Sequence, residues 1–422
     1  MDNRIIDQLE AAYADEFTLV AGDLGVLEEA VKAKIQQLGH GLLQRLVDRD
    51  ANGYKGSSMA CKCGNSMKFI QHRSKDIHTL FGWITVKRAY YHCSDCGKSL
   101  FPYDTASGLG SEQVSSGLAN ACCLLAVDDS FEQSSRKIEA LTGQKVSDNT
   151  IERVVCHVGS VVREQQDQQL ERYLENKQIP GPLSKPGKLY IAMDGTTVHE
   201  TDGWHESKIA VIYFEDERKQ RQNRYVGRFE SSETFGWHVW VEACKCGFRQ
   251  SKEVIYLGDG APWIRTEHRR HFGRATFIID WYHASEYVWD CGKKLFGEGT
   301  KETEQWVGRH LDLLWEGWTK RVLDDLVGQR KKYRGAKRDA MNTLIRYISS
   351  NEEQMRYDVF RAKGYHVGSG AVEGACKNVV GKRLKQSGMM WRRLGSSSVL
   401  ALRICWLNKE WEQLWRRKPL AA

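Results

Sequence analysis

The feature that most constrains the fold is a succession of short apolar runs between residues 188 and 280, where β-type and helical segments follow one another. Three β-type runs come first: KLYIAMDGTTV, HESKIAVIYFEDE and NRYVGRFE. A helical stretch around TFGWHVWVEACK follows, then EVIYLGDG, a helix after Pro262, ATFIID and a further helix. Three successive strands followed by alternating helices and strands predict a mixed sheet covered by helices, so we expect an α/β fold.

Three acidic residues stand where an apolar run ends: Asp194 in IAMDGTT, Asp259 in IYLGDGAP and Asp280 in FIIDWYH. Ligands and metals gather at the ends of strands, because side chains there leave the core but keep a rigid support. A single Asp-Gly pair is also common in turns. Three acids at strand ends in one sheet-like region favour a functional site over chance turns.

A fourth acid, Glu373 in GSGAVEGACK, is framed by Gly368, Gly370 and Gly374. Glycines allow close approach to a metal or a nucleic-acid backbone, which a solvated glutamate does not need. Together with the strand-end aspartates, Glu373 would bind two divalent cations about 4 Å apart, as phosphodiester chemistry requires. Ligands that are all oxygen favour Mg²⁺ or Mn²⁺ over zinc.

The segment DWYHASEY places Asp280, His283, Glu286 and Tyr287 at helical spacings of three and four. In a functional interpretation, Asp280 or His283 borders the metal site and orients a ligand or the scissile phosphate. In a structural one, Asp280 is a helix N-cap and His283 a satisfied, partly buried histidine. Both interpretations stay open, with a supporting role favoured for Asp280.

The motifs MDGTTV with GWHESKIA, GDGAPWI, IIDWYHASEY and GSGAVEGACKNVVGKRLKQSGMMW, in this order, resemble bacterial insertion-sequence transposases of the ISKra type, which are similar to the Mutator-like group. The resemblance extends from about residue 56 to the C-terminus. It implies an RNase H-like domain whose DDE triad is Asp194, Asp259 and Glu373, separated by 64 and 113 residues, with a helical insertion before the glutamate. Asp280 and His283 match an Asp-x-x-His element that usually accompanies the triad.

Four cysteines form two pairs around β-type sequence: Cys61 and Cys63 in CKCGN, and Cys93 and Cys96 in CSDCGK, with 29 residues between the pairs. Two such knuckles on a β-hairpin are what a zinc ribbon needs, with four thiolates in a tetrahedron. The second pair has the usual C-x-x-C spacing, whereas the first is the shorter C-x-C. The alternative is four unliganded thiols on a small β unit.

Residues 130–154, SFEQSSRKIEALTGQKVSDNTIERV, predict two helices with a turn at 142–145, and Ser147 opens the second helix. In the context of the family this helix-turn-helix would read the terminal inverted repeats of the element. Asn149, Thr150 and Arg153 are then the candidate contacts with DNA. A helical hairpin without a DNA-binding role is the alternative.

The C-terminal segment is strongly basic, with eleven Lys and Arg against Glu410 and Glu412 in residues 374–418, a local balance of +9 in a chain of net charge +8. A basic segment at one end indicates a polyanion partner, by default nucleic acid. Basic residues suit phosphates, and an aromatic suits stacking on an exposed base. A solvated helix face, with a core tryptophan, is the alternative. The candidate DNA contacts are Lys377, Lys382, Arg383, Lys385, Trp391, Arg392 and Arg393.

The organisation along the chain follows from these shifts in character. Residues 1–55 predict amphipathic helix, and residues 178–187 hold three of the six prolines, which marks a linker. We expect a helical region at 1–55, a zinc-ribbon-like β unit at 56–105, a helical helix-turn-helix region at 106–177, the linker at 178–187, the first part of the RNase H-like domain at 188–290, an all-helical insertion at 291–362, and C-terminal helices with the basic tail at 363–422.

The longest apolar run, LANACCLLAV, is shorter than the roughly 18 residues of a membrane helix. The acidic N-terminus lacks the features of a signal peptide, so we expect a cytoplasmic, nucleoid-associated protein in which the twelve cysteines are free thiols or metal ligands.

The resulting expectation is a DDE transposase that cleaves DNA at element ends and transfers the strand into target DNA, acting as a homo-oligomer with two Mg²⁺ or Mn²⁺ ions and a structural Zn²⁺. The alternatives are a metal-dependent nuclease of the same fold without strand transfer, and a non-catalytic protein that binds DNA through its zinc and helix-turn-helix regions.

Overall fold

The structure is a computed structural model of the chain. It describes residues 6–7, 11, 23–50, 53–110, 112–176, 181–182, 184–216, 218–368 and 370–416. The chain divides into two compact units, one of residues 1–155 with 412–422 and one of residues 156–411. The division falls inside helix α6 (Asp148–Asn176), whereas the expected linker at 178–187 lies partly outside the described residues.

The first unit contains a small antiparallel sheet in the order β1-β2-β3-β4, formed by β1 (Ser58–Ala60), β2 (Ser66–Thr79), β3 (Gly82–His92) and β4 (Ser99–Leu100). Strands β2 and β3 form a long hairpin. At the turn end of the hairpin, Ile77, Ile84 and Val86 are buried and pack against Leu43 and Val47 of helix α2 (Leu24–Asp50). These apolar contacts attach α2 to the sheet.

Four helices follow the small sheet: α3 (Pro102–Ser107), α4 (Ser116–Ala126), α5 (Phe131–Thr142) and α6. Side-chain caps mark the starts of α4 and α5, since Ser115 accepts from the backbone N–H of Leu118 and Ser130 from that of Gln133. Gly143 ends α5 in a left-handed conformation, and Ser147 Oγ accepts from the N–H of Thr150 at 3.2 Å in the first turn of α6. The two helices and the intervening turn expected at 130–154 are therefore present.

The second unit contains a mixed five-stranded sheet in the order β7-β6-β5-β8-β9. Its strands are β5 (Lys188–Glu200), β6 (Gly203–Glu215), β7 (Arg221–Arg228), β8 (Glu253–Gly258) and β9 (Thr276–Ile279). β5, β6 and β7 pair antiparallel, whereas β8 and β9 are parallel to β5. The expected mixed α/β architecture is confirmed at this level.

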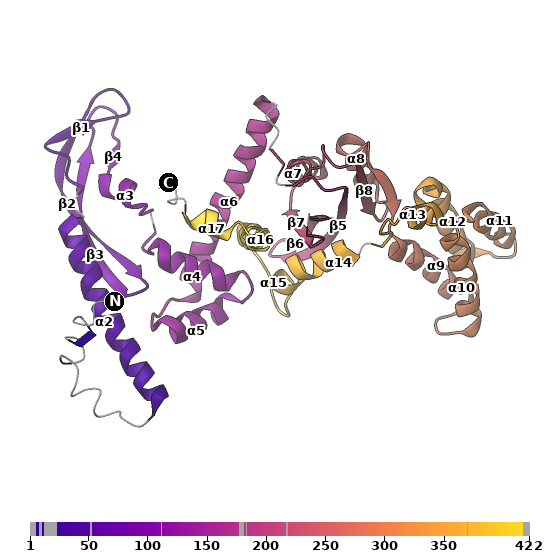
Figure 1. Ribbon diagram of the computed structural model, residues 1–422, viewed down its shortest axis with the longest axis horizontal. Coiled ribbons are helices and arrows are strands. Elements are labelled where there is room, and N and C mark those ends of the chain that lie inside the picture. Colours follow the sequence, from indigo (N-terminus) through magenta and orange to yellow (C-terminus); the bar gives the residue numbers. More distant parts are fainter. Residues whose placement is uncertain are drawn as a thin grey trace. The chain divides into compact units, whose positions relative to one another are not determined.

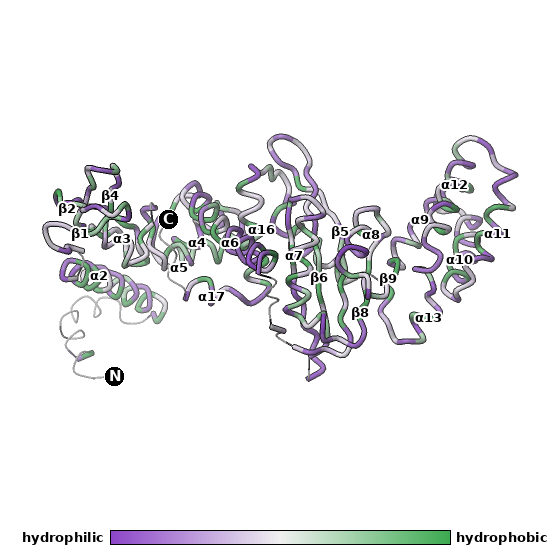
Figure 2. Tube along the Cα trace, turned by 90° about the horizontal axis from the view of Figure 1, so that it is seen from above, coloured by the Kyte–Doolittle hydropathy of each residue, from purple (hydrophilic) through white to green (hydrophobic). Residues whose placement is uncertain are grey.

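Helices cover both faces of the larger sheet (Figure 1). Leu189, Ile191 and Met193 of β5 are buried in a core with α7 (Ser232–Lys245) and α8 (Pro262–His271). Because side chains alternate along a strand, the residues between them face the other side, where α14 (Gly370–Ala375) packs against β5 and β6. Figure 2 shows apolar residues concentrated along the strands of this sheet.

Residues 291–362 contain helices and no strand. After α9 (Trp281–Phe296), the helices are α10 (Lys301–Trp315), α11 (Thr319–Arg330), α12 (Gly335–Ser350), the 3₁₀ helix η1 (Glu352–Met355) and α13 (Tyr357–Ala362). Beyond α14 come a π-helical turn, η2 (Cys376–Gly381), α15 (Lys382–Leu384), α16 (Arg393–Leu407) and α17 (Trp411–Arg416).

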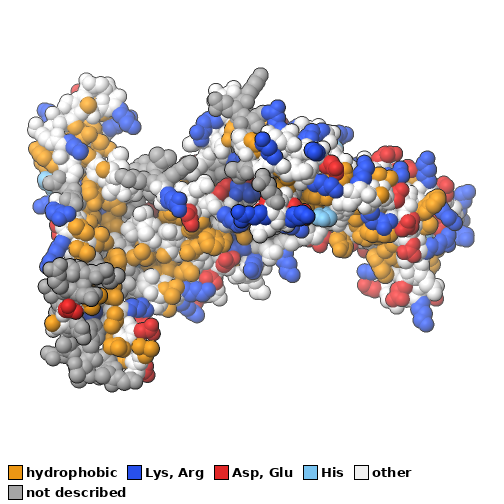
Figure 3. Space-filling model, in the orientation of Figure 1, with side chains coloured by type: hydrophobic (Ala, Val, Ile, Leu, Met, Phe, Trp, Pro, Cys, Tyr) orange, Lys and Arg blue, Asp and Glu red, His pale blue; other side chains and the backbone are white. Residues whose placement is uncertain are grey.

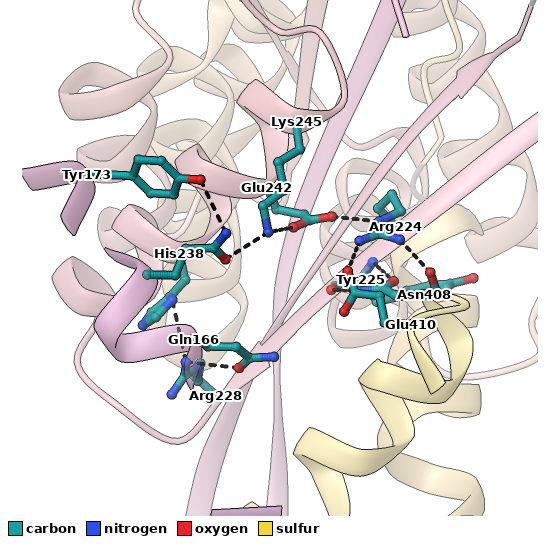
Figure 4. Close-up of polar contacts among 11 residues, drawn as sticks. Gln166, Tyr173, Arg224, Tyr225, Arg228, His238, Glu242, Lys245, Asn408 and Glu410 are labelled. Atoms are coloured by element: carbon teal, nitrogen blue, oxygen red, sulfur yellow. Dashed lines mark hydrogen bonds and ion pairs between the residues drawn. The ribbon is translucent and has the colours of Figure 1, made fainter. Parts of the chain in front are cut away.

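A polar network ties the end of α16 to the edge of the sheet (Figure 4). Arg224 of β7 donates to Glu242 of α7 at 2.6 Å and also pairs with Glu410. The side chain of Asn408 accepts from the N–H of Tyr225 at 2.8 Å and donates to its carbonyl at 2.9 Å. Asn408 thus satisfies both backbone groups of Tyr225 on this edge strand, as a residue of an additional strand would.

Candidate active site and metal centres

Three acids lie at one level of three adjacent strands. The pairing of β5 with β8 ends two residues before Asp194 and Asp259, and that of β8 with β9 ends one residue before Asp259 and Asp280. If the pairing of β5 with β8 and of β8 with β9 is continued by one or two residues, Asp194 falls opposite Asp259 and Asp259 opposite Asp280. The three acids are therefore neighbours across the strands. The structure thus brings together acids that are far apart in the sequence. Asp259 and Asp280 follow the ends of β8 and β9, but Asp194, expected at a strand end, lies in the middle of β5, because β5 continues in its pairing with β6 beyond the point where β8 ends.

Asp194 lies on the face of β5 that carries α14, and its carboxylate is partly buried. Its Oδ1 accepts from the N–H of Gly195 at 2.7 Å, and Oδ2 accepts from the thiol of Cys376 at 3.5 Å. Burial raises the pKa of Asp194, and the negative charge of Asp259 raises it further. A cation bound beside Asp194 would favour the charged form of this carboxylate.

Asp259 begins the loop after β8. Its Oδ1 accepts from the N–H of Ala261 at 2.8 Å, and its carbonyl accepts from the hydroxyl of Tyr347 in α12 at 3.1 Å. Gly260 has φ of +87°, and a Cβ there would meet Ile279 Cδ1 at 2.9 Å. The tight turn that positions Asp259 therefore requires glycine at the next position.

Asp280 and His283 occupy the start of α9. Asp280 is buried and accepts from the N–H of Tyr282 at 3.1 Å, so it is the N-cap of the helix. His283 Nε2 lies 3.9 Å from Asp280, and its Nδ1 lies 3.2 Å from Glu286. Asp280 therefore caps α9 and also lies next to His283. The structural interpretation of Asp280 as an N-cap does not conflict with a supporting role beside a metal site.

The electrostatic surroundings of His283 connect it to the strand-end acids. Burial lowers the pKa of the imidazole, yet the acids around it outweigh burial, so its pKa is raised. In order of effect, the first three are Asp280, Asp259 and Asp194. His283 therefore lies close enough to all three acids to feel their charge, which places it at the same site.

Glu373 is exposed on α14, the helix that packs on Asp194's face of the sheet. One helical turn further, Cys376 contacts Asp194, so Glu373 and Asp194 lie in the same neighbourhood. The loop before α14 is held by α9: the N–H of Trp281 donates to the carbonyl of Val367 at 2.9 Å, and a Cβ on Gly368 would meet the ring of Tyr282 at 2.8 Å.

The four predicted cysteines lie together at the base of the hairpin in the first unit. The Sγ atoms of Cys61 and Cys96 are 3.6 Å apart, those of Cys63 and Cys93 are 3.8 Å apart, and all four lie within 4.8 Å of one another. The backbone turns back after Cys61 and Cys93, which accept from the N–H groups of Gly64 and Gly97. The short C-x-C spacing therefore does not prevent convergence, and the four thiols could hold a metal ion.

A second cluster of possible metal ligands lies on the hairpin between β5 and β6: Glu200, Asp202 and His205. Glu200 is already compensated, because its buried carboxylate accepts from Ser396 Oγ at 2.6 Å and pairs with Arg393 Nε at 3.1 Å. His205 lies 2.9 Å from Asp202. This cluster was not predicted, and its near-neighbour spacing around the turn was the only signal.

The predicted DNA contacts of the first unit lie on the first turns of α6. Asn149 and Arg153 are exposed and Thr150 is partly so. Arg153 pairs with Glu112 at 2.7 Å, and the hydroxyl of Thr150 lies 2.9 Å from that of Ser147. Asn149 is therefore the most openly presented of the three.

The predicted contacts of the basic tail divide into exposed and buried residues. Five are exposed: Lys377, Lys382, Lys385, Arg392 and Arg393. Arg383 and Trp391 are buried, with Arg383 stacked over the Trp391 ring and the indole N–H donating to the carbonyl of Leu384 at 3.0 Å. Trp391 is thus a core residue, the alternative left open by the sequence, and we leave both out of the proposed DNA contacts. Figure 3 shows Lys and Arg side chains on the visible face of this unit.

Three contacts at the site were not predicted. Cys376 was detectable, since it follows Glu373 by one helical turn on the same segment. Lys385 donates to Thr196 Oγ1 at 2.8 Å, which brings a tail cation two residues from Asp194. Tyr347 contacts the Asp259 carbonyl across 88 residues of chain, and no local pattern announces such a contact.

Residues 23–415 match the model of UPF0236, an uncharacterised protein family. The chain belongs to this family. A UPF0236 relative, the "UPF0236 protein in vanSb 3'region" of Streptococcus gallolyticus, is 24% identical over 360 residues, which cover 81% of this chain and 75% of that protein. In the described part of this UPF0236 protein, no helix is long and apolar enough to cross a membrane.

Proposed function

We propose that this UPF0236 protein is a DDE transposase that cleaves DNA at the ends of a mobile element and joins the freed 3′ ends to target DNA. The observation that carries the proposal is the alignment of Asp194, Asp259 and Asp280 across three strands, with Glu373 on a helix over the same face. Carboxylates that meet at the same level of adjacent strands can bind the metal ions that phosphodiester chemistry uses.

The topology supports this proposal. A sheet of three antiparallel strands continued by two parallel ones, in the order β7-β6-β5-β8-β9, is the arrangement expected of an RNase H-like domain. The helices of residues 291–362 stand between Asp280 and Glu373 in the chain, where the resembled transposases have a helical insertion. We therefore assign residues 188–290 and 363–411, all of them in the second unit, to one catalytic domain.

The donor set fits divalent magnesium or manganese. Asp194, Asp259 and Glu373 offer only carboxylate oxygens, which these hard cations prefer. Asp194, Asp259 and Glu373 would hold the ions. Bound there, two ions supply an activated water or 3′-hydroxyl and stabilise the leaving oxygen during in-line displacement at phosphorus.

The chain's other residues prepare the site for a polyanion. His283 Nε2 lies 3.9 Å from Asp280, which caps α9, and the imidazole would donate a hydrogen bond to a phosphate oxygen. Lys377 and Lys385 are exposed near Glu373 and Thr196, where they would bind the DNA backbone.

The first unit would recognise the element ends. We propose that Cys61, Cys63, Cys93 and Cys96 bind one structural Zn²⁺ in a zinc-ribbon-like sheet, because four thiols within 4.8 Å match its tetrahedral preference. The helix pair of residues 130–154 would read the terminal repeats through Asn149, with Thr150 and Arg153 beside it.

The test is incubation of the purified protein with end-labelled element DNA, unlabelled target DNA and Mg²⁺. A transposase yields both a cut at the element end and a longer product in which the labelled strand is joined to target. A metal-dependent nuclease yields the cut without the joined product, and a non-catalytic DNA-binding protein yields neither. Absence of both products, with DNA binding intact, overturns the proposal.

A further inference from the structure

An apolar stripe runs along the exposed side of α2, the helix that attaches to the small sheet of the first unit. Its members are Leu24, Val31, Ile35, Leu38, Leu42 and Leu46. Leu24, Ile35 and Leu42 are 75%, 57% and 61% exposed, which is high for apolar side chains that lie in line. Figure 2 shows apolar residues recurring along this helix.

The stripe is distinct from the surface by which α2 is held. Leu43 and Val47 pack against the sheet core, and Gln44 exchanges two hydrogen bonds of 2.9 Å with the backbone of Thr85. These residues project from a different side of the helix than Ile35 and Leu42. The contacts that hold α2 in its own unit therefore leave the stripe exposed.

The spacing of the stripe is that of a coiled-coil seam. From Leu24 the seam positions advance by four and three residues in alternation, through Glu28, Val31, Ile35, Leu38, Leu42 and Arg45 to Arg49. Such a 3.5-residue repeat places one residue per layer against a partner helix. The four central positions are apolar. The acidic Glu28 precedes them and the basic Arg45 follows them.

The charges of Glu28 and Arg45 indicate which helix could pair with α2 and in which direction. In a parallel pair of identical helices, Glu28 would face Glu28 and Arg45 would face Arg45, which is unfavourable at seam positions. In an antiparallel pair centred between Ile35 and Leu38, Ile35 faces Leu38, Val31 faces Leu42 and Glu28 faces Arg45. The helix is therefore complementary to a reversed copy of itself, as a two-fold symmetric interface requires.

We propose that α2 forms an antiparallel coiled coil with α2 of a second copy of this chain, making the protein a homodimer through its N-terminal unit. Val31, Ile35, Leu38 and Leu42 form the apolar centre, and a Glu28–Arg45 pair closes each end. This interface requires neither DNA nor metal, so it holds or fails independently of the proposed transposase activity.

The test is sedimentation equilibrium of the full-length protein without DNA over the micromolar range. The wild type sediments as a dimer, and Leu42→Asp raises the dissociation constant at least tenfold. Leu141→Asp, at an apolar α5 residue that is 67% exposed outside the stripe, leaves it unchanged. Circular dichroism checks that each variant keeps its helix content.

Charge reversal tests the direction of the helices. Glu28→Arg and Arg45→Glu each weaken the dimer about tenfold, and the double variant restores the wild-type dissociation constant, because the pair is re-formed with its signs exchanged. A parallel pair would not show this rescue. A monomeric wild type, a dimer that Leu42→Asp does not weaken, or a wild type that dimerises only after deletion of residues 1–22 overturns the proposal.

Discussion

At the scale of single residues, the second unit places several charged groups where burial alone would neutralise them. Glu242 is buried between Arg224 at 2.6 Å and Lys245 at 3.1 Å (Figure 4). Burial raises the pKa of Glu242, but the two cations outweigh it and hold the pKa below its ordinary value. The charged form of this carboxylate therefore contributes to the stability of the fold.

Replacing Glu242 by Gln is expected to lower the free energy of unfolding by about 3 kcal/mol at pH 7, because Lys245 loses its carboxylate and Arg224 keeps only Glu410. Since the folded pKa is depressed, the contribution is present above the unfolded pKa and is lost as pH falls through it toward the folded one. Urea unfolding at pH 7 and pH 4 measures both effects, with the difference from wild type shrinking at pH 4.

Glu233→Gln is the matched control, since Glu233 is an exposed acid of the same helix, 3.8 Å from Arg270. Its effect should stay within about 0.5 kcal/mol at both pH values. Equal effects of the two substitutions at pH 7 would contradict the account of Glu242.

At the scale of elements, the turn after β8 is held in a conformation that only glycine adopts easily. Gly260→Ala is expected to lower the free energy of unfolding by more than about 1 kcal/mol, because φ of +87° strains an alanine and its Cβ would press on Ile279. Gly308→Ala in the interior of α10, where a Cβ meets nothing within 4 Å, should instead raise stability by roughly 0.5–1 kcal/mol. Urea titrations of the two variants showing the same sign of change would refute this.

The small sheet of the first unit is expected to depend on its proposed metal. Elemental analysis of protein purified without chelators should find one zinc per chain in the wild type and in Cys156→Ala, whose thiol lies outside the cluster. Cys93→Ser should retain far less, because a structural zinc site needs its complete ligand set. Zinc at background level in the wild type would rule out the site.

Sequence reasoning works best where the signal is local. Asp194, Asp259 and Asp280 were chosen as candidates because each follows an apolar run, and the two cysteine pairs because each is a short motif. It could not give the order of strands, since the pairing of β8 beside β5 joins segments more than sixty residues apart. Arg383 was predicted to be an exposed DNA contact because it belongs to a basic segment. In the structure its guanidinium is buried over the Trp391 ring, a tertiary contact that the charge pattern does not reveal.

At the scale of the whole molecule, we propose that the first unit carries recognition and dimerisation and that the second carries the chemistry. The proposed catalytic residues come from four places in the chain: the middle of β5, the ends of β8 and β9, and α14. A site assembled from such distant segments depends on the whole second unit being folded, so each triad substitution must be compared with a substitution that leaves the fold and the site intact.

The central claim is tested most directly by DNA cleavage with triad variants. Asp194→Asn, Asp259→Asn and Glu373→Gln remove one charge each with little change in shape, and Glu233→Gln removes an exposed acid of α7. With labelled element-end DNA and Mg²⁺, each triad variant should cleave at least about a hundredfold more slowly than wild type, since the ligand set is incomplete. Glu233→Gln should cleave at the wild-type rate. Cleavage by the three triad variants at the rate of Glu233→Gln would contradict the proposed function.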